Sequence, residues 1–346
     1  MLTLLIALYC LLAIFLIVFS KESSHKYIYF AFCLLLIFLA GLRPQGFDPD
    51  YEQYLKVFYN GSKKSRIEPT FFLITNLVKS LFNHPIFLFL IYSIIGVSLK
   101  FIGFKQLTKY YLFSAFLYLC NYFLLHEMTQ IRVGVASGLL LLCIKPLYNR
   151  DLKKFLLFII LAISFHYSAL ILVPLWFMNV KKINKKIYIS IIPVMYLLVL
   201  SGVTITFLIE QIPIDQVQFL FKMYQFQMKS GKGGALNIFN VLQLIRCCMA
   251  IFMIFNISLI AKNNKYSFLL IKIYVISLLS LPLFSDVPVI GFRISELMGV
   301  VEVILIPLLI SVFVQKRIAK VYIVIVGALM LFMNLFYTQL FSFEWY

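Results

Sequence analysis

The chain has 346 residues, of which 63% are hydrophobic and 13% are charged, and its formal net charge is +18. A water-soluble domain is about 45–50% apolar and about 25% charged, so this composition excludes a water-soluble fold. The basic excess does not indicate nucleic-acid binding, because the lysines stand in short clusters between apolar blocks, as in residues 181–186, and such clusters are typical of cytoplasmic loops.

Apolar blocks follow one another along the chain, and most approach the ~20 residues that a helix needs to cross the membrane. A transmembrane β-barrel would instead show shorter segments of alternating hydrophobicity. The blocks cover residues 2–20, 27–42, 69–82, 86–104, 110–125, 131–148, 155–179, 187–208, 238–260, 266–284, 292–314 and 321–342. The sequence therefore predicts an all-α, polytopic helical membrane protein with about 10–12 membrane segments, forming a single integral membrane domain over residues 1–346.

The first block, residues 2–20, is predicted to be a transmembrane helix and not a signal peptide, because it lacks a basic start and a small-residue cleavage site. For the rest of the chain, the distribution of lysine and arginine predicts which loops lie on the cytoplasmic side of the membrane. The positive-inside rule predicts cytoplasmic positions for the basic loops 21–26, 100–109, 149–154, 181–186, 261–265 and 315–320.

Residues 43–58, directly after the second block, form the first outer segment and carry several polar side chains. Turn residues place the carboxylates of Asp48 and Asp50 in a loop. The stretch from Asp50 to Phe58 predicts a short amphipathic helix with Tyr51, Tyr54 and Phe58 on one side. A plain helix cap in a solvated loop is the alternative interpretation. The spacing of the two aspartates is only a weak metal signal, and no metal site is predicted.

The block at 69–82 is short and includes Asn76 and Lys79. These polar residues suit an amphipathic helix lying in the outer membrane interface better than a helix that crosses the membrane.

Three arginines stand at the predicted outer ends of helices: Arg43, Arg132 and Arg293. The outer side normally carries few basic residues, so their presence calls for an explanation. Each could extend to lipid headgroups. The alternative is that their planar, permanently charged guanidinium groups hold phosphate oxygens.

The block at 155–179 has basic residues at both ends, Lys153-Lys154 and Lys181-Lys182. A re-entrant hairpin with its apex at residues 165–168 would keep both clusters cytoplasmic, whereas one long tilted helix would place the second cluster outside. Irregular backbone at that depth requires burial in protein or a water-filled cavity. The hairpin therefore predicts a polar cavity near His166, whose imidazole is suited to proton transfer. A structural histidine bonded to a backbone carbonyl is the alternative.

Three of these stretches resemble the EpsG family, within the wider group of Wzy-type polysaccharide polymerases. The stretches are Arg43-x-x-Gly46-x-Asp48-x-Asp50-Tyr51-x-x-Tyr54 followed by Glu68-Pro69, then Gln130-Ile131-Arg132, and then Ala162-Ile-Ser-Phe-His166-Tyr-Ser-Ala169 followed by Pro174. Arg293-Ile-Ser is a weaker match, since the family often has aromatic residues where this chain has Glu296-Leu-Met. The good matches cover roughly residues 40–175.

The resemblance implies a membrane glycosyltransferase of the bacterial inner membrane, with its active site facing the periplasm. Such an enzyme joins oligosaccharide repeat units carried on undecaprenyl diphosphate into O-antigen or a related surface polysaccharide. Membrane lipid and a chain-length-regulating co-polymerase are the further partners that it implies. No cofactor is expected, because the sugar is already activated by diphosphate.

On this interpretation the arginines stabilise the negative charge of the lipid diphosphate as it leaves. The acceptor hydroxyl needs a base, and either His166 or Asp48 could serve. The sugar-binding residues are expected to be Asp50, Tyr51, Tyr54 and Gln130.

Three other functions remain open from the sequence. A flippase for the same lipid-linked units would show two related halves or a cation-lined path, and no repeat is visible. A membrane acyltransferase would need an acyl-CoA path from the cytoplasm, where the loops offer only short lysine clusters. An O-antigen ligase is a close chemical relative that sequence separates poorly, although the first-loop motif favours a polymerase.

Overall fold

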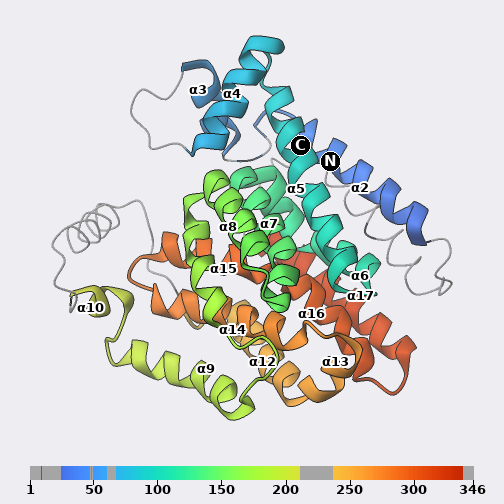
Figure 1. The fold of residues 1–346 in the computed structure, drawn as a ribbon, viewed down its shortest axis with the longest axis vertical. Helices are drawn as coiled ribbons and strands as arrows, with labels where there is room; N and C mark the ends of the chain where they lie inside the picture. The colour runs from blue at the N-terminus through green and yellow to red at the C-terminus, as the bar shows by residue number, and fades with distance from the viewer. Residues whose placement is uncertain are drawn as a thin grey trace. The chain divides into compact units, whose positions relative to one another are not determined.

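The computed structural model describes residues 25–46, 48, 50–60, 68–210 and 237–337, together with Tyr9. Every regular element in these ranges is helical, and none of them contains a strand (Figure 1). The predicted all-α class is therefore confirmed. The predicted first helix lies outside the described residues apart from Tyr9, and residues 211–236 also lie outside them.

Among the described residues, three helices are long and apolar enough to cross a membrane. They are α5 (Ile86–Leu107), α7 (Ile131–Asn149) and the span Lys316–Phe336, which contains α17 (Lys316–Phe332). Two bent pairs raise the number to five: α12 (Val241–Phe255) with α13 (Ile257–Asn263), bent by 73°, and α15 (Pro288–Gly299) with Glu302–Ser311, bent by 45°. Further apolar helices are shorter. The polytopic helical class is thus confirmed.

The chain folds into two compact units. The first unit comprises Met1–Leu175 and Val303–Tyr346, and the second comprises Trp176–Glu302. Each is described here by itself, and the single-domain organisation stays a prediction.

In the first unit, α5 packs against α2 (His25–Gly41) and α7, and α7 packs in turn against α8 (Leu152–Phe165). Glycine allows the close approach of α5 and α7. A Cβ at Gly138 would lie 2.8 Å from the Leu99 side chain, and one at Gly103 would lie 2.8 Å from that of Leu141. Small residues at membrane helix interfaces have this effect generally.

The segment that follows α2, predicted to lie on the outer side, forms the helix that its hydrophobic pattern predicts. Helix α3 (Tyr51–Asn60) buries Tyr51 and Tyr54 on one side, and α4 (Pro69–Leu81) buries Phe71 and Val78. Pro69 suits the first position of α4 because its fixed φ fits a helix and its missing N–H needs no partner there. The interfacial position of α4 stays a prediction.

The break predicted within 155–179 is confirmed. Helix α8 ends at Phe165, and a 3-10 helix, η3 (Tyr167–Phe177), follows after His166. The start of α8 is fixed by Asp151, whose side chain accepts a hydrogen bond from the Lys154 N–H. A return of the two arms to one membrane face stays a prediction.

One basic residue differs from its predicted environment. The prediction that Lys100 belongs to a cytoplasmic loop at 100–109 is wrong, because α5 continues to Leu107 and buries Lys100 completely. The physical reason is a buried carboxylate partner, Glu127, which a count of basic residues cannot reveal.

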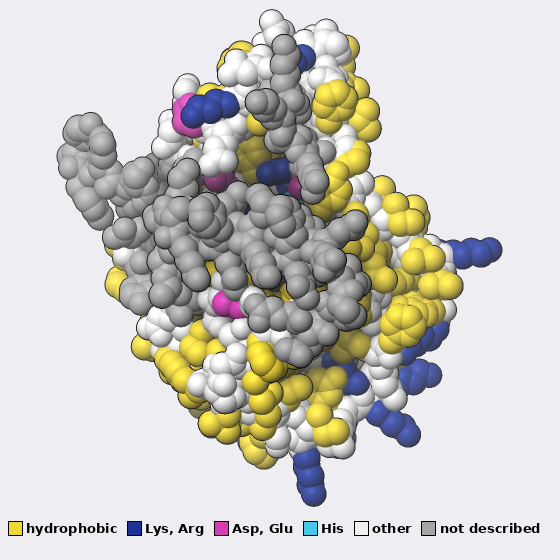
Figure 2. Space-filling view, turned by 90° about the vertical axis from the view of Figure 1, so that its left-hand side faces the viewer, with side chains coloured by type: hydrophobic (Ala, Val, Ile, Leu, Met, Phe, Trp, Pro, Cys, Tyr) yellow, Lys and Arg dark blue, Asp and Glu magenta, His cyan; other side chains and the backbone are white. Residues whose placement is uncertain are grey.

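In the second unit, α14 (Ser267–Leu283) packs against α9 (Lys185–Leu200), α12, α13 and α15. Its Lys272 donates hydrogen bonds to two backbone carbonyls, those of Asn179 and Lys182. Across the described chain many large hydrophobic side chains are exposed, and Figure 2 shows hydrophobic side chains on the face in view. Such a surface suits contact with lipid.

Candidate functional site

Arg43, the first of the three arginines predicted to bind phosphate, forms a buried ion pair. Arg43 Nε donates to Asp48 Oδ2 at 2.8 Å, and both side chains have 0% exposure. Asp48 Oδ1 accepts the backbone N–H of Asp50 at 3.1 Å. The guanidinium carbon of Arg43 lies 4.2 Å from the ring centroid of Phe89. Gly46, at φ +76°, provides the turn that returns the chain towards Arg43.

The contacts of Asp48 matter because Asp48 is one of the two candidate bases for the acceptor hydroxyl. Burial raises the pKa of Asp48, although the charge and hydrogen bond of Arg43 oppose that rise. One oxygen of Asp48 accepts from Arg43 and the other accepts the Asp50 N–H, so its contacts suit a residue that orients the arginine, and its role as a base stays a prediction. Nη2 of Arg43 is buried and has no partner within the described residues, so it could still donate to a ligand.

The second cluster is centred on Glu68, the residue before α4. Its Oε2 pairs with Arg132 Nη1, and its Oε1 lies 2.8 Å from Nδ1 of His166. Arg132 stands in the first turn of α7, and His166 stands at the break between α8 and η3. One carboxylate therefore holds two of the predicted site residues from opposite oxygens.

The contact with Glu68 determines what His166 can do. We assign the proton to Nδ1, because this nitrogen faces a carboxylate. Nε2 is then an acceptor, and it is buried with no hydrogen-bond partner among the described residues. A histidine oriented by a carboxylate with a free acceptor nitrogen has the geometry of a general base.

Glu68 is suited to remain ionised in this position. Burial alone would raise the pKa of Glu68, but the hydrogen bond to His166 and the positive charge of Arg132 outweigh burial and hold it below its usual value. The Arg132 side chain is still 29% exposed. It is therefore more accessible to a ligand than Arg43.

Aromatic rings lie between the two clusters. Tyr51 stacks on Phe89 with centroids 4.6 Å apart, and the Tyr54 centroid is 6.1 Å from the same ring. Tyr54 also lies 5.9 Å from the guanidinium carbon of Arg132, and burial raises its pKa to about 12 despite that charge. Both tyrosines pack inside the unit, and their predicted stacking on sugars stays a prediction.

The remaining predicted residues fall in different places. Gln130 lies between the π-helix that precedes α7 and α7 itself, and its buried Oε1 has no partner in the described structure. Asp50 lies at the start of α3. Arg293 is exposed on α15 of the second unit, so the structure groups Arg43 with Arg132 but gives no such grouping for Arg293.

Sequence reasoning missed the role of Glu68, which was recognisable only as the acidic residue before Pro69. The available signal was a carboxylate directly before an apolar helix in a chain with only 13 acidic residues. It also missed the pairing of Lys100 with Glu127. Within the described residues, no group of three or more His, Cys, Asp or Glu side chains could hold a metal ion.

Comparison with known proteins places these features in context. A family model described as the EpsG family matches residues 26–346. The amylovoran biosynthesis protein AmsC of Erwinia amylovora is 28% identical over 196 residues, which cover 51% of this chain and 52% of AmsC. The chain thus matches about half the length of that relative. No solved structure matches.

Proposed function

Because the chain belongs to the EpsG family, we propose that it acts in polysaccharide biosynthesis as a membrane glycosyltransferase. Its substrates are oligosaccharide repeat units carried on undecaprenyl diphosphate, which it polymerises into O-antigen or a related surface polysaccharide. The reaction takes place at the periplasmic face of the bacterial inner membrane. The family match and the relative's role in amylovoran biosynthesis support the general role, and the site geometry supports the finer proposal.

The observation that carries the proposal is the cluster of Glu68, His166 and Arg132. Nε2 of His166 takes the proton from an acceptor hydroxyl. The hydroxyl oxygen then forms a bond to the anomeric carbon of the donor sugar as the bond from that carbon to the diphosphate oxygen breaks. The released lipid diphosphate carries away the bonding electrons, and Glu68 stabilises the imidazolium that has formed.

The arginines act on the leaving group. Negative charge develops on the diphosphate in the transition state, and fixed cations in a water-poor site stabilise such charge strongly. Arg132 offers the accessible guanidinium, while Arg43 is held by Asp48 and Phe89, and its buried Nη2 has no partner among the described residues. Arg293 remains a proposed third contact.

An assay with purified protein in detergent tests the proposal, using the lipid-linked repeat unit as sole substrate. We expect a ladder of products on a gel, together with release of undecaprenyl diphosphate. Transfer of finished polymer onto a lipid A core without a ladder would indicate a ligase. Appearance of the unchanged lipid-linked unit in the opposite leaflet of proteoliposomes would indicate a flippase, and either result would overturn the proposal.

A further inference from the structure

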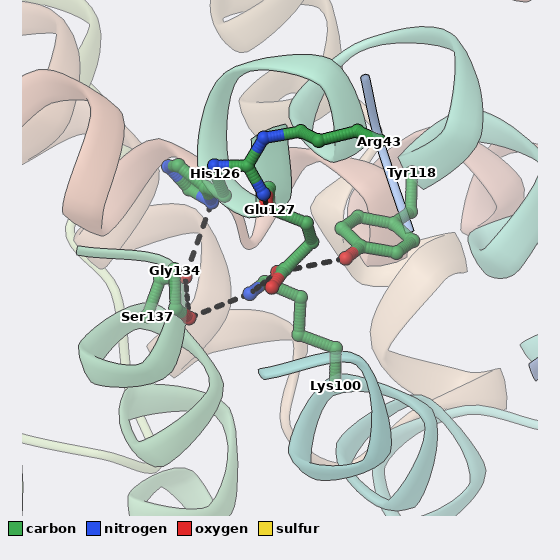
Figure 3. Close-up of polar contacts among 7 residues, drawn as sticks. All are labelled: Arg43, Lys100, Tyr118, His126, Glu127, Gly134 and Ser137. Carbon is green, nitrogen blue, oxygen red and sulfur yellow. Dashed lines mark hydrogen bonds and ion pairs between the residues drawn. The ribbon is translucent and has the colours of Figure 1, made fainter. Parts of the chain in front are cut away.

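A third polar cluster of the first unit lies among α5, α6 (Tyr111–Cys120) and α7 (Figure 3). Lys100 Nζ donates to Glu127 Oε1 at 2.5 Å and to the carbonyl of Gly134 at 2.6 Å. The hydroxyl of Tyr118 donates to the same carboxylate oxygen at 2.8 Å. The side chains of Lys100 and Glu127 are 0% and 1% exposed. A complete ion pair is therefore buried between helices.

A buried ion pair is weak evidence for stability, because well-packed neutral residues often stabilise a fold equally well. Ionisable residues inside membrane proteins are also rare and are often functional. We therefore expect a functional role of this ion pair in addition to any contribution to helix packing.

The carboxylate partner belongs to an irregular segment. Glu127 lies in a π-helix, η2 (Leu124–Thr129), which ends where the N–H of Gln130 donates to the Leu125 carbonyl at 2.8 Å. Ser137 of α7 contacts Nδ1 of His126 at 3.1 Å. Side chains from α5, α6 and α7 therefore fix this short segment, and π-helical turns occur frequently at functional sites.

The same segment is connected to both arginines of the candidate site. The backbone carbonyl of Glu127 accepts a hydrogen bond from Nη1 of Arg43 at 3.4 Å, and Figure 3 shows Arg43 beside this residue. Arg132 follows η2 closely, in the first turn of α7. A shift of η2 would consequently move the acceptor that holds Arg43 and the start of the helix that carries Arg132.

Two glycines leave room for this packing. A Cβ on Gly96 of α5 would collide with Oε2 of Glu127, and one on Gly134 would lie 2.5 Å from the carbonyl oxygen of His126. The carboxylate and the π-helix are therefore packed directly against the backbones of α5 and α7.

We propose that Lys100 and Glu127 are positioning residues, which fix η2 so that Arg43 and Arg132 together bind the lipid diphosphate. This inference rests on the proposed function, since it concerns the same anion.

The test compares Lys100→Met, Glu127→Gln and the double variant in the full-length purified protein. Two quantities are measured for each: the Kd for undecaprenyl diphosphate in detergent, and the thermal unfolding midpoint. Each single variant leaves one buried charge unpaired and should unfold at lower temperature. The double variant has no charge at either position, so it should recover most of the unfolding midpoint. It should nevertheless bind the lipid diphosphate about tenfold more weakly, as expected when one positioned hydrogen bond to a charged group is lost.

Lys272→Met is the matched control, because Lys272 is another buried lysine whose ammonium donates to backbone carbonyls, and it belongs to the second unit. It should leave the Kd unchanged. A double variant with a wild-type Kd would show that the pair does not position the arginines and would overturn the inference. A wild-type protein that binds no lipid diphosphate would overturn the proposed function as well.

Discussion

At the scale of single residues, Glu68 connects the two sides of the proposed chemistry. Its two oxygens hold His166, the proposed base, and Arg132, the proposed contact to the leaving group. A glutamine in its place would keep the shape but could no longer stabilise an imidazolium or neutralise the guanidinium. The carboxylate thus acts through two other residues.

We expect Glu68→Gln to lower the rate of transfer at saturating donor by about 100-fold, as misplacement of a catalytic group can. Glu52→Gln is the matched control, because Glu52 is an exposed glutamate of α3 that bonds only Gln45 among the described contacts, and it should retain wild-type activity. Equal rates for the two variants would contradict the role of Glu68.

The lowered pKa of Glu68 predicts that the stability of the fold depends on pH. Its pKa lies below the usual 4.5 in the fold, so the folded state binds this proton more weakly than the unfolded state does. The carboxylate therefore stabilises the fold at neutral pH, and this contribution is lost as pH falls below about 4.5 and through the lower folded value. Thermal unfolding midpoints from pH 7 to pH 3 should fall more steeply for wild type than for Glu68→Gln, and parallel curves would contradict this.

At the scale of elements, sequence patterns located helices better than the partners of their polar residues. Amphipathic spacing predicted a helix with Tyr51 and Tyr54 on one side, which is the side that α3 buries, and basic residues flanking 155–179 predicted the break at His166. The same charge counting misplaced Lys100, because a lysine beside a loop and a lysine paired within a helix look alike in sequence. The periodicity of a sequence predicts which side of a helix is buried, but it does not identify the residue with which a buried charged side chain pairs.

The packing of α5 against η2 gives a prediction for Gly96. Gly96→Ala adds a methyl group that would collide with the Glu127 carboxylate, and overpacking of this kind costs about 1–3 kcal/mol. The thermal unfolding midpoint should fall, whereas Ile94→Ala, at a position of α5 that is 44% exposed, should change it little. An unchanged midpoint for Gly96→Ala would show that η2 has room to move.

At the scale of the whole molecule, composition and block length were sufficient to predict a helical polytopic protein. The site could be predicted only in part. Glu68 and His166 are 98 residues apart in sequence, and Glu68 and Arg132 are 64 apart, so their meeting depends on tertiary packing that no local pattern encodes. His166 and Arg132 could be singled out because each is a polar residue within apolar sequence.

Membrane topology gives a prediction at this scale. With a re-entrant hairpin at 155–179, Lys153→Cys and Lys182→Cys should both react with an impermeant maleimide only when it reaches the cytoplasmic side. A Cys248→Ser background removes the thiol that is exposed among the described cysteines. Labelling of the two positions from opposite sides would show a single crossing instead.

The measurement that tests the central claim most directly is the polymerisation rate of His166→Gln with purified protein and the lipid-linked repeat unit. His84→Gln is the matched control, because His84 is exposed and its Nδ1 only accepts the backbone N–H of Ile86. If His166 is the base, its variant should lose at least about 100-fold in rate, the usual contribution of general base catalysis, while His84→Gln forms the wild-type ladder. A wild-type rate for His166→Gln would contradict the account.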